Sequence, residues 1–94
     1  MENHLLSFIT NGSGDVITVH TDINGIDYLL SILGLLRTQM VRGECPHEHL
    51  FSADWGRGDL TTSKLSDQPE EEKIVHHVKI YGWTDSWKTK QNLL

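Results

Sequence analysis

A single stretch of this chain has the spacing of a long helix, and that limits the folds open to it. From about residue 25 to residue 43, apolar side chains recur every three or four positions, which is the period of one helix face. Asp22 or Asn24 can cap its start and Gly43 can end it. We expect this stripe, centred on Leu33, to be the main element of the core. Its apolar residues are Ile26, Leu29, Leu30, Leu33, Leu36 and Met40.

The segments on both sides of this helix have the composition of β-strands. Before it, the Asn11-Gly12 pair is typical of a hairpin turn and is followed by a run rich in β-branched residues. After it, Pro46 opens a third strand. The expected strands cover residues 5–9, 15–21, 47–52, 60–65 and 74–83.

This order of elements, ββ-α-βββ, predicts an α+β fold. A single helix would pack on one face of a small, mostly antiparallel sheet. Residues 66–73 contain Pro69 and three consecutive Glu, which indicates a solvated loop. The polar tail, residues 84–94, is expected to be frayed, although Trp87 can dock on the body.

The size and charge of the chain narrow its possible partners. Its 94 residues form one domain, since shorter pieces would bury too little surface. The 13 acidic and 8 basic residues give a net charge of −5, which disfavours nucleic acid and suits a basic partner. The lone Cys45, the absence of signal-peptide features and the lack of a bilayer-length apolar run favour a cytoplasmic protein that does not enter membranes.

Histidines occur in two short clusters that raise the question of a metal site. The His-x-His spacing on a strand places both rings on one face, and Cys45 and Glu48 are close in sequence. No complete ligand motif is present, so a structural role for these histidines is the stronger interpretation. The candidate ligands are His47, His49, His76 and His77.

A catalytic role has weaker support. Cys45 precedes Pro46 and has no basic cluster or helix start nearby to lower its pKa, so it is a poor candidate nucleophile. Gly56 and Gly58 do not connect a strand to a helix, so they indicate a turn and not a phosphate site. We expect neither catalysis nor a cofactor.

One face of the expected sheet has no helix to cover it, and antiparallel sheets tolerate a solvated face. Because strand residues alternate between faces, the last strand divides into two sets. The set expected to face the helix is Ile74, His76, Val78 and Ile80. The set on the open face mixes rings with a charge, as interfaces do, and comprises Val75, His77, Lys79, Tyr81 and Trp83.

Two segments resemble the immunity protein 32 family of bacterial polymorphic toxin systems. They are residues 47–56, with the sequence HEHLFSADWG, and residues 75–83, with the sequence VHHVKIYGW. The helix entry around Asp22, Gly25 and Leu29 is also similar, and the resemblance covers most of residues 16–83. It implies a small α+β protein that binds and neutralises a cognate toxin stoichiometrically, without catalysis. A basic, nuclease-type toxin would suit the acidic charge of this chain.

These observations predict a partner-binding surface on the open face. Tyr and Trp concentrate binding energy at interfaces, and acidic groups at a rim would steer a basic partner. The expected anchors are Trp55, Lys79, Tyr81 and Trp83. The expected rim residues are Asp54, Asp59, Glu70, Glu71 and Glu72. Two alternatives stay open: a small histidine-rich metal-binding protein or metal-dependent enzyme, and an oligomerisation module that buries the open face or an edge strand against its own copy.

Overall fold

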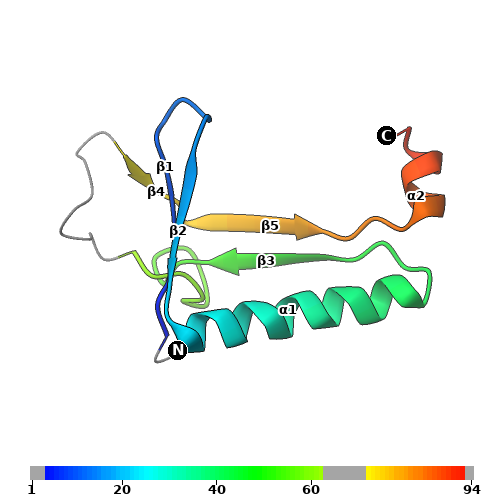
Figure 1. Cartoon of the computed structure of the whole chain (residues 1–94), viewed down its shortest axis with the longest axis horizontal. Coiled ribbons are helices and arrows are strands. Elements are labelled where there is room, and N and C mark those ends of the chain that lie inside the picture. The colour runs from blue at the N-terminus through cyan, green and yellow to red at the C-terminus, as the bar shows by residue number, and fades with distance from the viewer. Residues whose placement is uncertain (1–3, 63–71, 93–94) are drawn as a thin grey trace.

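The computed structural model describes residues 4–62 and 72–92, and it has the expected α+β class. The elements follow the order ββαβββα, so a short second helix is added to the predicted order (Figure 1). Their bounds are β1 (Leu6–Thr10), β2 (Ile17–Thr21), α1 (Ile23–Val41), β3 (His47–Phe51), β4 (Lys73–Ile74), β5 (His77–Tyr81) and α2 (Asp85–Lys90).

The start of α1 is fixed by its predicted cap and by close contact with β1. The Asp22 carboxylate accepts hydrogen bonds from the backbone N–H of Gly25 (2.7 Å) and of Leu5 (3.0 Å), and these bonds lower the pKa of Asp22. A Cβ at Gly25 would lie 2.0 Å from the carbonyl oxygen of Leu5, so only glycine allows this approach. At the other end, Gly43 has a φ of +86° just beyond the helix, as predicted.

The strands form two small antiparallel sheets and not the single sheet that we expected. One has the order β2-β1-β4 and the other pairs β3 with β5. The predicted strand 74–83 is divided between them, because Ile74 pairs with Ile9 of β1 whereas residues 77–81 pair with β3. The strand predicted at 60–65 is reduced to one bridge between Leu60 and Ser52, and residues 63–65 lie outside the described part.

The core is drawn from almost the whole chain. Leu6, Ile32, Leu50 and Leu60 are buried together, and they are flanked by Phe8, Tyr28, Leu29, Val78 and Ile80. The predicted centre of the helix stripe was wrong: Leu33 is 42% exposed, whereas Ile32 and Leu36 are buried. The physical reason is that α1 has apolar residues on more than one side. Strands β1 and β3 cover the side that carries Ile32, and the sequence of the helix alone does not show which side they will cover.

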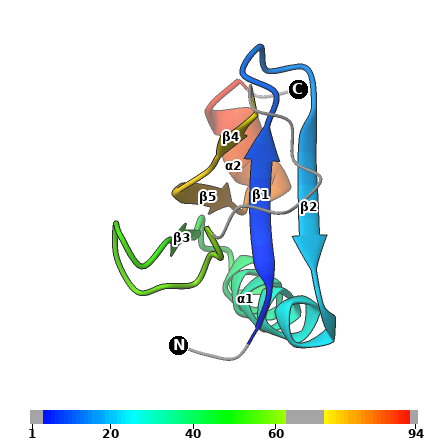
Figure 2. The same ribbon diagram turned by 90° about the vertical axis from the view of Figure 1, so that its left-hand side faces the viewer.

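The two sheets stand at a steep angle to each other, which gives the molecule an elongated shape. In Figure 1, β3 and β5 run along α1, and the hairpin of β1 and β2 stands across them. Figure 2 shows β1 and β2 side by side with α1 seen end-on below. The radius of gyration is 15.1 Å, compared with about 12 Å for a compact domain of this length. Much of the surface therefore lies on open faces.

The tail is more ordered than predicted. Residues 85–90 form α2, which is capped by the Thr84 side chain, and the indole N–H of Trp87 donates to the carbonyl of Gly43 (3.0 Å). This bond joins α2 to the turn that follows α1. Within residues 4–62 and 72–92, no helix has both the length and the apolar character needed to cross a bilayer.

Candidate functional site

The side of the β3–β5 sheet that faces away from α1 carries a set of rings. Strand alternation puts every second residue of β3 on this side, and the register aligns His47 with Tyr81 and Phe51 with His77. Leu50 points the other way, into the core with Ile32 of α1. We call this surface the ring face; it comprises His47, His49, Phe51, His77, Lys79, Tyr81 and Trp83.

These rings form an almost continuous stacked layer. Phe51 and His77 stack with centroids 4.4 Å apart, and His49 lies 5.0 Å from His77. Farther along, His47 stacks on Tyr81 (5.2 Å). Tyr81 in turn stacks on Trp83 (6.1 Å), and the Lys79 ammonium lies 5.1 Å from the Tyr81 ring centroid. Mutual stacking restricts the rotamers of these side chains before any partner arrives, so less entropy is lost on binding.

Two histidines of the ring face are joined by a hydrogen bond. His49 Nδ1 lies 2.8 Å from His77 Nε2, so one ring donates and the other accepts. The nitrogen that accepts must carry no proton, so at least one of the two rings is neutral. Burial lowers the pKa of His49, and the charges of His47, His77 and Lys79 lower it further.

An open hollow with a volume of about 420 Å³ adjoins one end of the ring face. Its walls are mostly apolar, and its lining residues are Glu48, His49, Phe51, Gly56 and Arg57. Gly56 lies directly against the Phe51 ring, because a Cβ there would meet Phe51 side-chain atoms at 2.8 Å. The absence of a side chain at Gly56 therefore allows the loop after β3 to pack against Phe51 at this end of the ring face.

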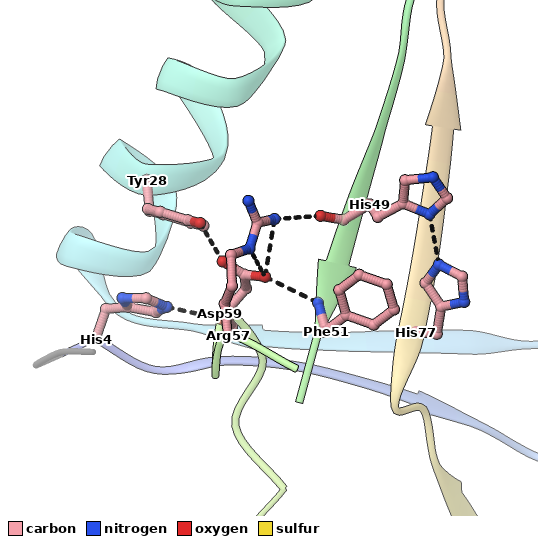
Figure 3. A network of polar contacts seen from close by, with 7 residues as sticks. All are labelled: His4, Tyr28, His49, Phe51, Arg57, Asp59 and His77. Atoms are coloured by element: carbon pink, nitrogen blue, oxygen red, sulfur yellow. Dashed lines mark hydrogen bonds and ion pairs between the residues drawn. The ribbon is translucent and has the colours of Figure 1, made fainter. Parts of the chain in front are cut away.

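Asp59 was predicted at the acidic rim, and that prediction was wrong. Its side chain is 1% exposed and accepts hydrogen bonds from the Tyr28 hydroxyl, the Phe51 N–H (2.9 Å) and the Arg57 guanidinium (3.2 Å). Figure 3 shows Arg57 and Asp59 lying between α1 and β3, with the His49 and His77 rings beyond β3. Asp59 is therefore a structural centre and not a contact for a partner.

The electrostatics of this centre favour an ionised Asp59. Burial alone would raise the pKa of the Asp59 carboxyl, but the hydrogen bonds from Tyr28 and Phe51 and the charge of Arg57 outweigh it and lower the pKa. Burial and the hydrogen bond to Asp59 raise the pKa of Tyr28 to about 12. Each group thus keeps its ordinary charge state at neutral pH.

Arg57 and Asp59 also act together along the free edge of β3. Asp59 accepts from the Phe51 N–H, and the Arg57 guanidinium donates to the His49 carbonyl. These two side chains satisfy backbone groups that a further strand would otherwise bind, which protects the edge from unwanted pairing. The same contacts hold Arg57 at the border of the hollow.

The other expected site residues are distributed as follows. Lys79 and Tyr81 are exposed on the ring face, with Tyr81 at 47%, and Trp83 is partly exposed. Trp55 is 62% exposed and stacks on His76 with centroids 5.3 Å apart, so it lies on the surface and not in the core. Asp54 is exposed and Glu72 is partly exposed. Two predicted rim residues lie outside the described residues, namely Glu70 and Glu71.

The four candidate metal ligands do not converge. His47, His49 and His77 share the ring face, but His76, expected to face α1, bonds to the Ser52 hydroxyl (2.8 Å) and stacks on Trp55. In the described part of the chain, no group of three or more His, Cys, Asp or Glu side chains is arranged to hold a metal ion.

The contact between Ser52 and His76 resembles a nucleophile with its base, but the Ser52 hydroxyl is buried. Ser52 is 0% exposed, and its N–H also donates to the His76 carbonyl (2.9 Å). A hydroxyl enclosed in this way cannot meet a substrate carbonyl. The pair therefore fixes the junction between β4 and β5.

Sequence reasoning missed the contributions of Phe51, His49 and Arg57 to this site. The alternation in residues 47–51 could have placed the first two on the open face, since His47, His49 and Phe51 are two positions apart. The role of Arg57 had no local signal, because it depends on Asp59 being buried beneath it. Comparisons of the chain with protein-family models, curated proteins and solved structures found no match.

Proposed function

We propose that this chain is an immunity protein that binds a cognate bacterial toxin stoichiometrically through the ring face. The observation that carries the proposal is the stacked and partly exposed row of rings on β3 and β5. Interfaces concentrate their binding energy in a few aromatic anchors, above all Tyr and Trp, and here Tyr81 and Trp83 are stacked together. The resemblance of residues 47–56 and 75–83 to the immunity protein 32 family is the reason for proposing a bacterial toxin as the partner.

The charge of the chain supports a basic partner. The net charge is −5, and the exposed Asp54 lies in the loop that also carries Trp55. Acidic groups around an aromatic centre accelerate encounter with a basic protein and do not need to be desolvated. A toxin that acts on nucleic acid has the basic surface that this arrangement would attract.

The proposal is tested by the kinetics of binding to the protein encoded by the adjacent gene, where a cognate toxin is expected. Tyr81→Ala should increase the dissociation rate about 30-fold, since a hot-spot residue contributes about 2 kcal/mol or more. Charge reversal at Glu70, Glu71 and Glu72 should mainly slow association, and added salt should reduce the difference.

The matched control is Ile17→Ala, which removes an exposed apolar side chain from β2, on the other sheet. It should leave both rate constants unchanged. Equal kinetics for wild type and Tyr81→Ala, with the variant shown to be folded by its circular dichroism, would exclude the ring face as the binding surface. Failure of co-expressed chain to protect cells from the toxin would exclude the immunity function itself.

A further inference from the structure

Helix α1 has a second apolar side that the rest of the described molecule leaves uncovered. Its first apolar side, with Ile32 and Leu36, is buried. The second side is between 42% and 77% exposed at every position, and it consists of Ile23, Ile26, Leu30, Leu33 and Val41. In Figure 1, no other element lies beyond α1 on the side away from β3. We call this second side the outer stripe.

The spacing of the outer stripe is that of a helix–helix seam. From Ile23 the apolar positions advance by three, four and three residues to Leu33. Alternation of three and four is the pattern by which one helix packs against another with side chains fitted into gaps. A contiguous exposed apolar surface of this kind marks an interaction site in a folded protein.

A glycine in the middle of the outer stripe has no explanation within one copy. Gly34 lies one turn after Leu30, and a Cβ built on it would meet no atom within 4 Å. Glycine inside a helix lowers its stability relative to alanine, so a reason for it is expected. A helix packed across this point would supply one, because a missing side chain creates a gap that a neighbouring leucine can fill.

We propose that a second copy of this chain packs its α1 antiparallel on the outer stripe, across a two-fold axis level with position 32 of the helix. About that level, Leu30 lies opposite the partner's Gly34, so a large side chain meets a gap. Ile23 lies opposite the partner's Val41. Both matches occur twice, as an interface related by a two-fold axis requires.

Charge complementarity identifies the second copy as the occupant. Asp27 lies beside the outer stripe, and Arg37 lies within it between Leu33 and Val41. The same two-fold axis places Asp27 level with the partner's Arg37. Within the described part of the chain, neither residue makes an ion pair. An unrelated partner would have no reason to match both the glycine and the charged positions of this helix about one centre. The ring face lies on the side of β3 away from α1, so the dimer leaves it free.

Sedimentation velocity of the full chain over a range of concentrations tests the dimer. The wild type should pass from monomer to dimer as its concentration rises. Asp27→Arg and Arg37→Asp should each weaken the dimer at least tenfold, because each creates two like-charge pairs across the axis. An equimolar mixture of the two variants should dimerise again, since every facing pair is then of opposite charge.

The control is Asp15→Arg, which makes the same change of charge in the loop between β1 and β2 and should leave the dimer unaffected. Recovery in the mixture also shows that both variants are folded. A wild type that stays monomeric at all concentrations would overturn the proposal. So would a dimer whose strength does not respond to either charge change, because its interface would then lie elsewhere, such as at the free edge of β2.

Discussion

At the scale of single residues, the Asp59 carboxylate connects parts of the chain that are distant in sequence. It binds Tyr28 of α1, Phe51 of β3 and Arg57 of the intervening loop, and its own backbone carbonyl accepts from His4 (2.8 Å). The His4 ring stacks on Tyr28 with centroids 4.9 Å apart. The carboxylate and the backbone carbonyl of Asp59 thus together orient the N-terminal segment, α1 and the edge of β3.

Removal of that anion should cost much of the stability of the domain. Asp59→Ala leaves the Tyr28 hydroxyl and the Phe51 N–H without their partner, and each buried donor left unsatisfied costs about 1–3 kcal/mol. Urea unfolding would measure the change. Asp54→Ala, which truncates an exposed carboxylate in the same loop, should change the free energy of unfolding by less than about 0.5 kcal/mol. Equal effects of the two substitutions would contradict the structural role of Asp59.

The lowered pKa of His49 predicts that the stability of the protein depends on pH. The pKa of His49 is lowered in the folded state by burial and by the charges of His47, His77 and Lys79. The unfolded chain therefore binds more protons below the unfolded pKa of about 6.5. The stabilising effect is complete above that pH and is lost as the pH falls toward the lower folded pKa. The thermal midpoint of the wild type should fall as the pH is lowered from about 7 to about 5.

His49→Gln should make that decline shallower, because the substituted side chain does not titrate. His20→Gln, which changes an exposed histidine of β2, is the control and should preserve the wild-type slope. An identical slope for wild type and His49→Gln would show that the shifted pKa of His49 does not govern the response.

At the scale of elements, the two apolar sides of α1 have separate roles. Ile32→Ala removes a buried side chain and should lower the free energy of unfolding by about 2–5 kcal/mol. Leu33→Ala, one position along, removes an exposed side chain and should cost less than about 1 kcal/mol in dilute, monomeric protein. Chemical denaturation would compare them. A larger loss for Leu33→Ala would mean that α1 turns Leu33, and not Ile32, toward the core.

Local signals in the sequence predicted where the helices and strands lie along the chain. They did not predict which strands would pair with each other. The cap at Asp22 and the stop at Gly43 depend on a few adjacent residues, so the bounds of α1 could be predicted. The side of β5 that carries Lys79 and Tyr81 followed from strand alternation alone. In contrast, the division of residues 73–81 between two sheets depends on pairing with β1 and β3, far away in the sequence.

In the candidate site too, local features could be predicted and contacts between distant residues could not. Tyr81 and Trp83 could be assigned to one exposed face, because both lie on one side of an extended segment. The burial of Asp59 could not be predicted, because its partner Tyr28 is 31 positions earlier and reaches it only once α1 lies beside β3. An acidic residue in a glycine-rich turn gives no local sign that it will be enclosed.

At the scale of the whole molecule, the junction between β4 and β5 holds the two sheets together. The Val75 N–H donates to Phe8 of β1 (2.8 Å), and the next residue, His76, accepts from the Ser52 N–H after β3 (2.9 Å). Adjacent residues therefore bind different sheets, and this lets the hairpin stand across β3 and β5. The ring face and the outer stripe consequently lie on different sides of one elongated body.

The core described above brings Leu6 and Ile32 into contact with Leu50, Val78 and Ile80. A ribosome that builds this chain synthesises β1, β2 and α1 well before β5. At about 5–20 residues per second, the 40 residues from the end of α1 at Val41 to the end of β5 at Tyr81 take roughly 2–8 s to appear. Until β5 leaves the ribosome, the side of α1 that carries Ile32 lacks part of its cover. This small domain therefore has a period of exposure during its synthesis in which chaperone binding and premature association compete with folding.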